Sequence, residues 1–110
     1  MFKSGTIFSN FTPLAKAPVI GYRISGEDVI KILKKLTNRN FSKDHSRVQI
    51  VNLFKKDGSL LDKCSVVYFK SPKSFTGDDV CEIFLHGSPL IASQFEQTLK
   101  DFKIPGLRLA

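Results

Sequence analysis

The sequence has 110 residues, which is enough for one domain with a modest core and too few for two independent domains. Hydrophobic residues make up 42% and charged residues 25%, as in ordinary soluble globular proteins. The net charge of +7 favours anionic partners, such as nucleic acid, phosphates or carboxylate-bearing ligands, although a basic surface without a dedicated partner would look the same. No apolar run approaches the ~20 residues that span a bilayer, and the N-terminus lacks the apolar stretch of a secretion signal. A cytoplasmic location is therefore expected.

The first half of the chain predicts two strands, a helix and a loop, over Thr6–Phe11, Pro18–Ser25, Gly26–Leu36 and Thr37–Ser46. The second strand is rich in β-branched and aromatic residues. Ser25 is the expected N-cap of the helix, with Asp28 three positions later in an arrangement that resembles a capping box. Apolar residues then recur at helical spacing, and lysines occupy the other side.

The second half predicts a hairpin, a further strand, a helix and a last extended segment, over Arg47–Lys56, Leu60–Lys70, Val80–Leu85, a helix from Pro89 to before Pro105, and Leu107–Ala110. The hairpin turn is indicated by Asp57-Gly58, and Ser88 is the expected N-cap of the second helix. The order ββαβββαβ predicts an α+β fold, a small mixed sheet with two helices. Because the chain stops inside an apolar extended run, we expect it to be truncated, the alternative being an edge strand that completes the sheet.

Glu82 is an acid inside an apolar segment, and such a group needs a partner. Strand alternation places Glu82, Phe84 and His86 on one face of the sheet. The carboxylate suits either a ligand that offers paired N–H donors or an internal salt bridge to Arg23 or a lysine. Arg23 is likewise a charge in the middle of an apolar strand, so the two residues are candidates for opposite halves of a polar pocket.

The spacing of Glu82 and His86 argues against a shared metal ion. On a strand these positions are roughly 13 Å apart, whereas on a helix they would be about 5–6 Å apart. Asp78 and Asp79 are expected to be loop residues that accept local backbone hydrogen bonds, and His86 a turn or capping residue. Cys64 and Cys81 lack CxxC spacing and are expected to be core residues.

Several segments together resemble the N-terminal domain of the tRNA-modification GTPase MnmE, also called TrmE. They are Tyr22-Arg23-Ile24-Ser25-Gly26, Leu61-Asp62, Val67-Tyr68-Phe69, Ser74-Phe75-Thr76-Gly77-Asp78-Asp79-Val80-Cys81-Glu82 and His86-Gly87-Ser88-Pro89. Their order and spacing agree across nearly the whole chain. Residues 1–110 would then be the N-terminal folate-binding and dimerisation domain, without the helical and GTPase domains.

The resemblance implies a domain similar to half of the folate-binding fold of the glycine-cleavage T protein. It implies a homodimer that binds 5-formyl-tetrahydrofolate or a related folate, with contacts at Arg23 and Glu82 and a further lysine beyond Ala110. It also implies that the complete protein binds GTP, Mg²⁺ and K⁺ and modifies the wobble uridine of tRNA together with MnmG. No P-loop sequence occurs in these residues, so no GTPase activity is expected of this chain alone.

Two positions depart from the family pattern. Leu14-Ala15-Lys16-Ala17-Pro18 replaces a glycine-rich run, and His86-Gly87-Ser88-Pro89 replaces the common HGGP.

Two other classes of function compete with this interpretation. A free-standing RNA-binding module would use the basic residues from α-helical and loop positions, Lys31, Lys34, Lys35, Arg39, Lys43 and Arg47, although a solvated face explains the same run. A small hydrolase would rest on Asp78, Asp79 and His86, but the sequence contains no recognisable activated nucleophile.

Overall fold

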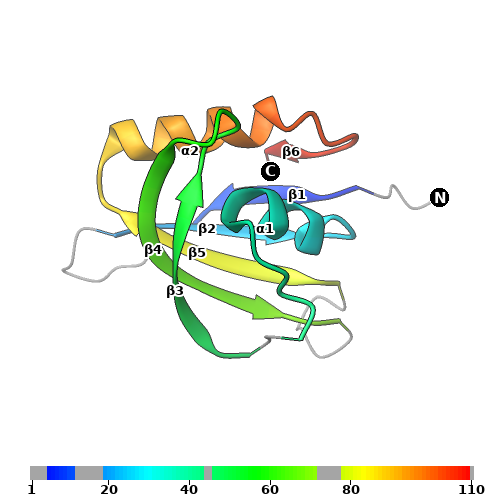
Figure 1. The fold of residues 1–110 in the computed structure, drawn as a ribbon. Helices are drawn as coiled ribbons and strands as arrows, with labels where there is room; N and C mark the ends of the chain where they lie inside the picture. Colours follow the sequence, from blue (N-terminus) through cyan, green and yellow to red (C-terminus); the bar gives the residue numbers. More distant parts are fainter. Residues whose placement is uncertain (1–4, 12–18, 44–45, 72–77, 110) are drawn as a thin grey trace.

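Six strands form one mixed sheet, and two helices pack against it (Figure 1). The computed structural model describes residues 5–11, 19–43, 46–71 and 78–109. In chain order the elements are β1 (Ile7–Asn10), β2 (Val19–Ser25), α1 (Val29–Thr37), β3 (Val48–Phe54), β4 (Leu60–Phe69), β5 (Val80–His86), α2 (Pro89–Asp101) and β6 (Arg108–Leu109). This order confirms the predicted α+β fold. None of the described helices is long and apolar enough to cross a membrane.

The strands lie in the order β3-β4-β5-β2-β1-β6. Neighbours pair antiparallel, except that β6 runs parallel to β1 through two residue pairs. The C-terminal extended segment thus finds its neighbour in β1, at one edge of the sheet. The pairing of β2 with β5 brings together Arg23 and Glu82, which are far apart in the sequence.

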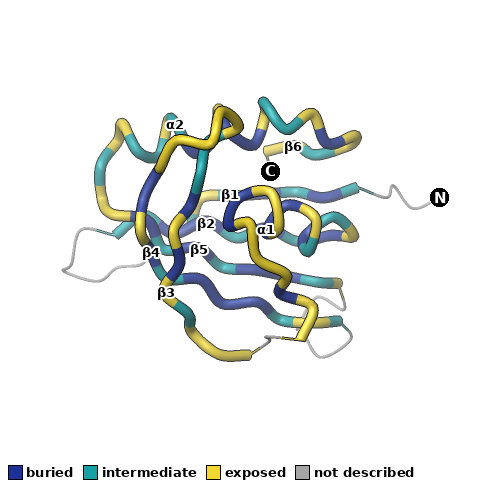
Figure 2. Tube along the Cα trace, in the orientation of Figure 1, coloured by how far each residue is buried: buried dark blue, intermediate teal, exposed yellow. Residues whose placement is uncertain are grey.

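The core lies between the helices and one face of the sheet, and buried and less buried residues alternate along β2 and β5 (Figure 2). Tyr22 and Phe95 are fully buried, and the Tyr22 hydroxyl donates a hydrogen bond to the Glu96 carboxylate, which ties β2 to α2. Cys64 and Cys81 are buried free thiols, as predicted, and burial raises the pKa of Cys64 to about 12. Both therefore act as small core residues.

The start of α1 differs from the prediction. Ser25 is still the last residue of β2, and the N-cap is Asp28, which makes no side-chain capping bond. The Asp28 amide instead donates to the Thr6 hydroxyl at 2.9 Å. Gly26, between Ser25 and Asp28, adopts a φ of +145°, and a Cβ there would meet Thr6 Cα at 2.6 Å. This close passage postpones the helix by three residues, because the backbone must turn past β1 before it can coil.

The hairpin and α2 form as predicted. The Lys55 amide donates to the Ser59 carbonyl at 2.8 Å, and Gly58 takes the positive φ of +88° that an Asp-Gly turn requires. Ser88 caps α2 by accepting a hydrogen bond from the Ile91 amide at 3.4 Å, and Pro89 occupies the first turn. Both elements therefore follow from local turn and capping chemistry.

Candidate functional site

Arg23 on β2 and Glu82 on β5 lie directly opposite each other in the antiparallel pairing. Their side chains are on the sheet face that points away from the helix-packed core. The Arg23 Nε and one terminal guanidinium nitrogen both donate to Glu82 Oε2, at 3.1 and 2.7 Å. The side chains are 34% and 18% exposed, respectively. The internal salt bridge, one of the two alternatives for Glu82, is thus present in the structure.

An aromatic platform adjoins the charge pair. The Phe11 ring lies over Gly21, where an added Cβ would meet the ring at 3.1 Å, so glycine leaves the space that the ring occupies. The Arg23 guanidinium carbon is 4.6 Å from the centroid of that ring, in a cation–π contact. Phe84 contacts Phe11 edge-on, with centroids 5.7 Å apart. We call Phe11, Gly21, Arg23, Glu82 and Phe84 the open-face cluster.

A cavity of about 360 Å³ lies beside this cluster on the same face. It is lined by Val19, Ile50, Lys63, Cys64, Ser65, Phe84, Leu85 and His86. Phe84 belongs to both the cavity and the open-face cluster. Arg23 and Glu82 hydrogen-bond directly and do not face each other across a pocket. The cavity begins at Phe84, two residues after Glu82 on β5.

His86 ends β5 and is held by Asp62 of β4. The Asp62 carboxylate accepts the His86 amide at 2.9 Å through Oδ2, and its Oδ1 lies 2.9 Å from His86 Nδ1. The pairing of β4 with β5 ends at Ser65 and Phe84. Beyond it, the Asp62 carboxylate accepts the His86 amide in place of a backbone carbonyl of β4. The prediction of a turn or capping role for His86 agrees with this geometry, since its carbonyl also accepts the Ser88 amide at 2.7 Å.

The acidic segment before β5 is partly described. Asp79 Oδ1 accepts the Ser71 amide at 2.8 Å, which confirms its predicted role in local backbone bonding. Burial, reinforced by the nearby Asp79 charge, raises the pKa of Tyr68 to about 12. Residues 74–77 of the motif and the loop Leu14–Pro18 lie outside the described residues. Glu82 and His86 are both on a strand, as predicted, and the described residues contain no group of three or more potential metal ligands.

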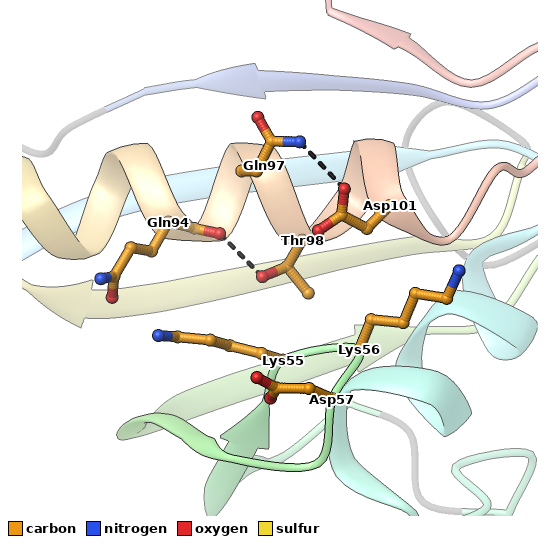
Figure 3. A pocket seen from close by; sticks show the side chains of 7 residues that line it. All are labelled: Lys55, Lys56, Asp57, Gln94, Gln97, Thr98 and Asp101. Carbon is orange, nitrogen blue, oxygen red and sulfur yellow. Dashed lines mark hydrogen bonds between the residues drawn. The ribbon is translucent and has the colours of Figure 1, made fainter.

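The basic residues named for the RNA-binding alternative do not form one uniform surface. Arg39 donates to the Gln49 side chain at 2.7 Å and stacks on Phe41, whereas Lys31, Lys34 and Lys35 are exposed along α1. A separate cavity of about 530 Å³ lies between the β3–β4 hairpin and α2 (Figure 3). Lys55 and Lys56 line it from the hairpin, and neither belongs to the predicted basic run.

Phe11, Gly21 and Asp62 are the members of these sites that the sequence patterns did not single out as candidates. Gly21 had a usable signal, because a glycine inside an apolar strand often marks a close approach of another group. Asp62 also had one, because it is a carboxylate in the apolar strand pattern of β4, like Glu82 in β5. Phe11 gave no signal, since its position at the end of a strand is compatible with either face.

The fold and the cluster define an α+β domain whose sheet face opposite the two helices carries a paired acid and base beside aromatic rings. Such a surface suits a small polar ligand or another protein surface. A family model described as "GTP-binding protein TrmE N-terminus" matches residues 6–110. The chain belongs to this family.

Curated relatives agree with the family match. The tRNA modification GTPase MnmE of Helicobacter pylori strain J99 is 45% identical over 106 residues, which cover 96% of this chain and 22% of the relative. The protein of the same name from Rickettsia canadensis is 42% identical over 105 residues, covering 96% of this chain and 23% of the relative. The chain thus spans less than a quarter of the length of these relatives.

Proposed function

We propose that this domain is the folate-binding and dimerisation module of a tRNA-modification GTPase. Its ligand would be 5-formyl-tetrahydrofolate or a related one-carbon donor, held by Arg23 and Glu82. The observation that carries the proposal is the cross-strand pairing of these two residues on the sheet face opposite the helices, in a chain of the TrmE N-terminal family. The relatives are named tRNA modification GTPases. The family resemblance further implies that the complete protein would act on the wobble uridine of tRNA with MnmG.

The chemistry of the open-face cluster supports a pterin ligand. In the structure the two donors from Arg23 converge on Oε2 of Glu82, and within the described residues Oε1 accepts no hydrogen bond. The amino-oxo edge of a pterin presents adjacent N–H donors, which a carboxylate accepts as a forked pair. Arg23 would then turn one of its N–H groups to a ligand carbonyl, the formyl oxygen or an anionic tail.

The aromatic rings supply the apolar part of such a site. Phe11 and Phe84 are half-buried and meet edge-to-face, so each retains ring surface for an aromatic ligand. The cavity of about 360 Å³ continues from Phe84 towards Lys63 and His86. A ligand with two aromatic rings and an anionic end fits this spatial arrangement, in which the charged pair is followed by the aromatic rings and then by basic groups.

Exposed apolar residues on β3 support a homodimer. Val48 is 65% exposed and Ile50 is 60% exposed, and both lie on an edge strand, on the same face as Glu82. Large apolar side chains with this exposure favour association with another protein surface. Light scattering over a concentration series tests this proposal: a monomer at every concentration, or an Ile50→Lys variant that self-associates as the parent does, would contradict it.

Isothermal titration with 5-formyl-tetrahydrofolate tests the ligand proposal, in protein extended past Ala110 because the resemblance places a further contact there. We expect Glu82→Ala to weaken binding roughly 100-fold or more, since two hydrogen bonds to a charged group are lost. Glu27→Ala, an exposed acid outside the open-face cluster, is the matched control. Unchanged affinity in a folded Glu82→Ala variant would reject the assigned role.

A further inference from the structure

The tip of the β3–β4 hairpin stands between the two helices and has a cavity on each side. The cavity towards α2, of about 530 Å³, is lined by Lys55, Lys56, Asp57, Gln94, Gln97, Thr98 and Asp101 (Figure 3). The cavity towards the end of α1, of about 230 Å³, is lined by Lys35, Asn38, Phe54, Lys55, Lys56, Gly58 and Phe102. Lys55 and Lys56 line both, so the two cavities form one continuous basic surface, which we call the hairpin surface.

The hairpin surface carries three lysines and two acids, so its formal net charge is +1 (3 − 2). Lys35, Lys55 and Lys56 take part in no ion pair among the described residues. The two acids keep their charge and are oriented by hydrogen bonds from uncharged groups: Asp57 accepts the Ser59 amide and hydroxyl at 2.9 and 2.6 Å, and Asp101 accepts the Gln97 side chain at 2.9 Å. Three lysines from two separate elements line one shared cavity, where each can still reach an anionic ligand.

We infer that the hairpin surface binds the phosphate backbone of RNA through Lys35, Lys55 and Lys56. Lysine is a point charge with three donors, which suits phosphate oxygens approached from different directions. The side-chain amides of Asn38, Gln94 and Gln97 on the same surface offer donors and acceptors for ribose hydroxyls. The choice of RNA among polyanions rests on the proposed function in tRNA modification.

The ring of Phe102 adds a group that phosphate binding alone would not need. Phe102 is half-buried at the end of α2, and the Lys35 ammonium lies 5.7 Å from its ring centroid. An aromatic ring beside a phosphate-binding lysine is a common arrangement in proteins that hold nucleic acid by charge and stacking. The hairpin surface thus combines phosphate, ribose and base contacts.

The hairpin surface is separate from the open-face cluster. Its cavities lie between the hairpin and the helices, whereas Arg23 and Glu82 lie on the opposite face of the sheet. RNA binding and folate binding therefore use different residues and can be lost independently. This separation makes the inference testable in a protein whose ligand site is intact.

The test measures binding of fluorescently labelled unmodified tRNA by anisotropy, over a series of KCl concentrations. For Lys55→Gln/Lys56→Gln we expect the slope of log K against log salt to become shallower by about 2, one per phosphate contact. At 0.1 M salt the loss of two contacts corresponds to roughly 60-fold weaker binding. Lys35→Gln should make the slope shallower by about 1.

The matched control is Lys43→Gln/Lys70→Gln, which removes the same net charge from two exposed lysines. Lys70 follows β4 at the end opposite the hairpin, roughly 30 Å away along the strand. The control should leave the slope nearly unchanged. Thermal melting of each variant establishes that it is folded.

Equal slopes for the hairpin variant and the control would overturn the inference. Competition by polyglutamate as strong as that by RNA would also overturn it, because the surface would then bind polyanions in general. Folate titration of the same variants separates the two proposals. Folate binding with equal slopes would reject the hairpin surface alone, and lysine-dependent RNA binding without folate binding would reject the folate site alone.

Discussion

Removal of Arg23 should destabilise the domain more than removal of Glu82, although the two residues form one pair. The Glu82 side chain is 18% exposed and that of Arg23 is 34% exposed. Arg23→Met leaves a mostly buried carboxylate without its two N–H donors. We expect a loss of about 2 kcal/mol in the free energy of unfolding, between the values for exposed pairs (up to about 1) and for broken buried pairs (about 3–5).

Glu82→Gln should cost about 1 kcal/mol, because the guanidinium that remains is one-third exposed and still rests on the Phe11 ring. Urea unfolding followed by circular dichroism measures both losses, and the double variant gives the coupling energy, expected to be about 1 kcal/mol. In a domain of this size that coupling corresponds to roughly 4 °C in Tm. Glu27→Gln is the exposed-acid control and should change stability by less than about 0.5 kcal/mol.

Equal losses for the two single variants would refute the reasoning from burial. A coupling energy below about 0.3 kcal/mol would show that the pair behaves like an ordinary solvated ion pair. The proposed ligand role of Glu82 would then have no support from a desolvated carboxylate.

Three further predictions concern the fold. Gly26→Ala should destabilise the domain by roughly 3 kcal/mol in urea unfolding, because its φ is +145° and a Cβ would overlap Thr6. Gly58→Ala, at a φ of +88° with no atom within 4 Å, should cost only about 1 kcal/mol, and similar costs would contradict the steric argument. Asp62→Ala should cost about 2 kcal/mol by leaving the His86 amide unpaired, and Asp62→Asn should cost less; the reverse order would count against a hydrogen-bonding role. Burial and then the Glu96 carboxylate raise the pKa of Tyr22 above its ordinary value of 10.0, so the neutral phenol stabilises the folded state below pH 10 and that contribution is lost as the pH rises further. Above pH 10 the free energy of unfolding of Tyr22→Phe should therefore fall less steeply with pH than that of the parent, by up to about 1.4 kcal/mol per pH unit. An unchanged pH profile would disprove the assignment.

The sequence alone determined the local elements and the faces of the central strands. Apolar periodicity predicted the order ββαβββαβ, and turn and capping residues predicted the hairpin at Asp57-Gly58 and the start of α2 at Ser88. Strand alternation also placed Glu82 on the face away from Cys81 and Ile83. These features depend on contacts within a few residues along the chain, so their signals are present in any short window.

Only the tertiary structure decided which of these elements become neighbours. The position of β2 between β1 and β5 joins Arg23 to Glu82 across 59 residues and lays Phe11 over Gly21. It also delays α1 past Ser25, because Gly26 must first pass close to Thr6. The convergence of Lys35 with the hairpin lysines has the same origin. Such contacts depend on strand order and on close packing between distant segments, which periodicity does not encode.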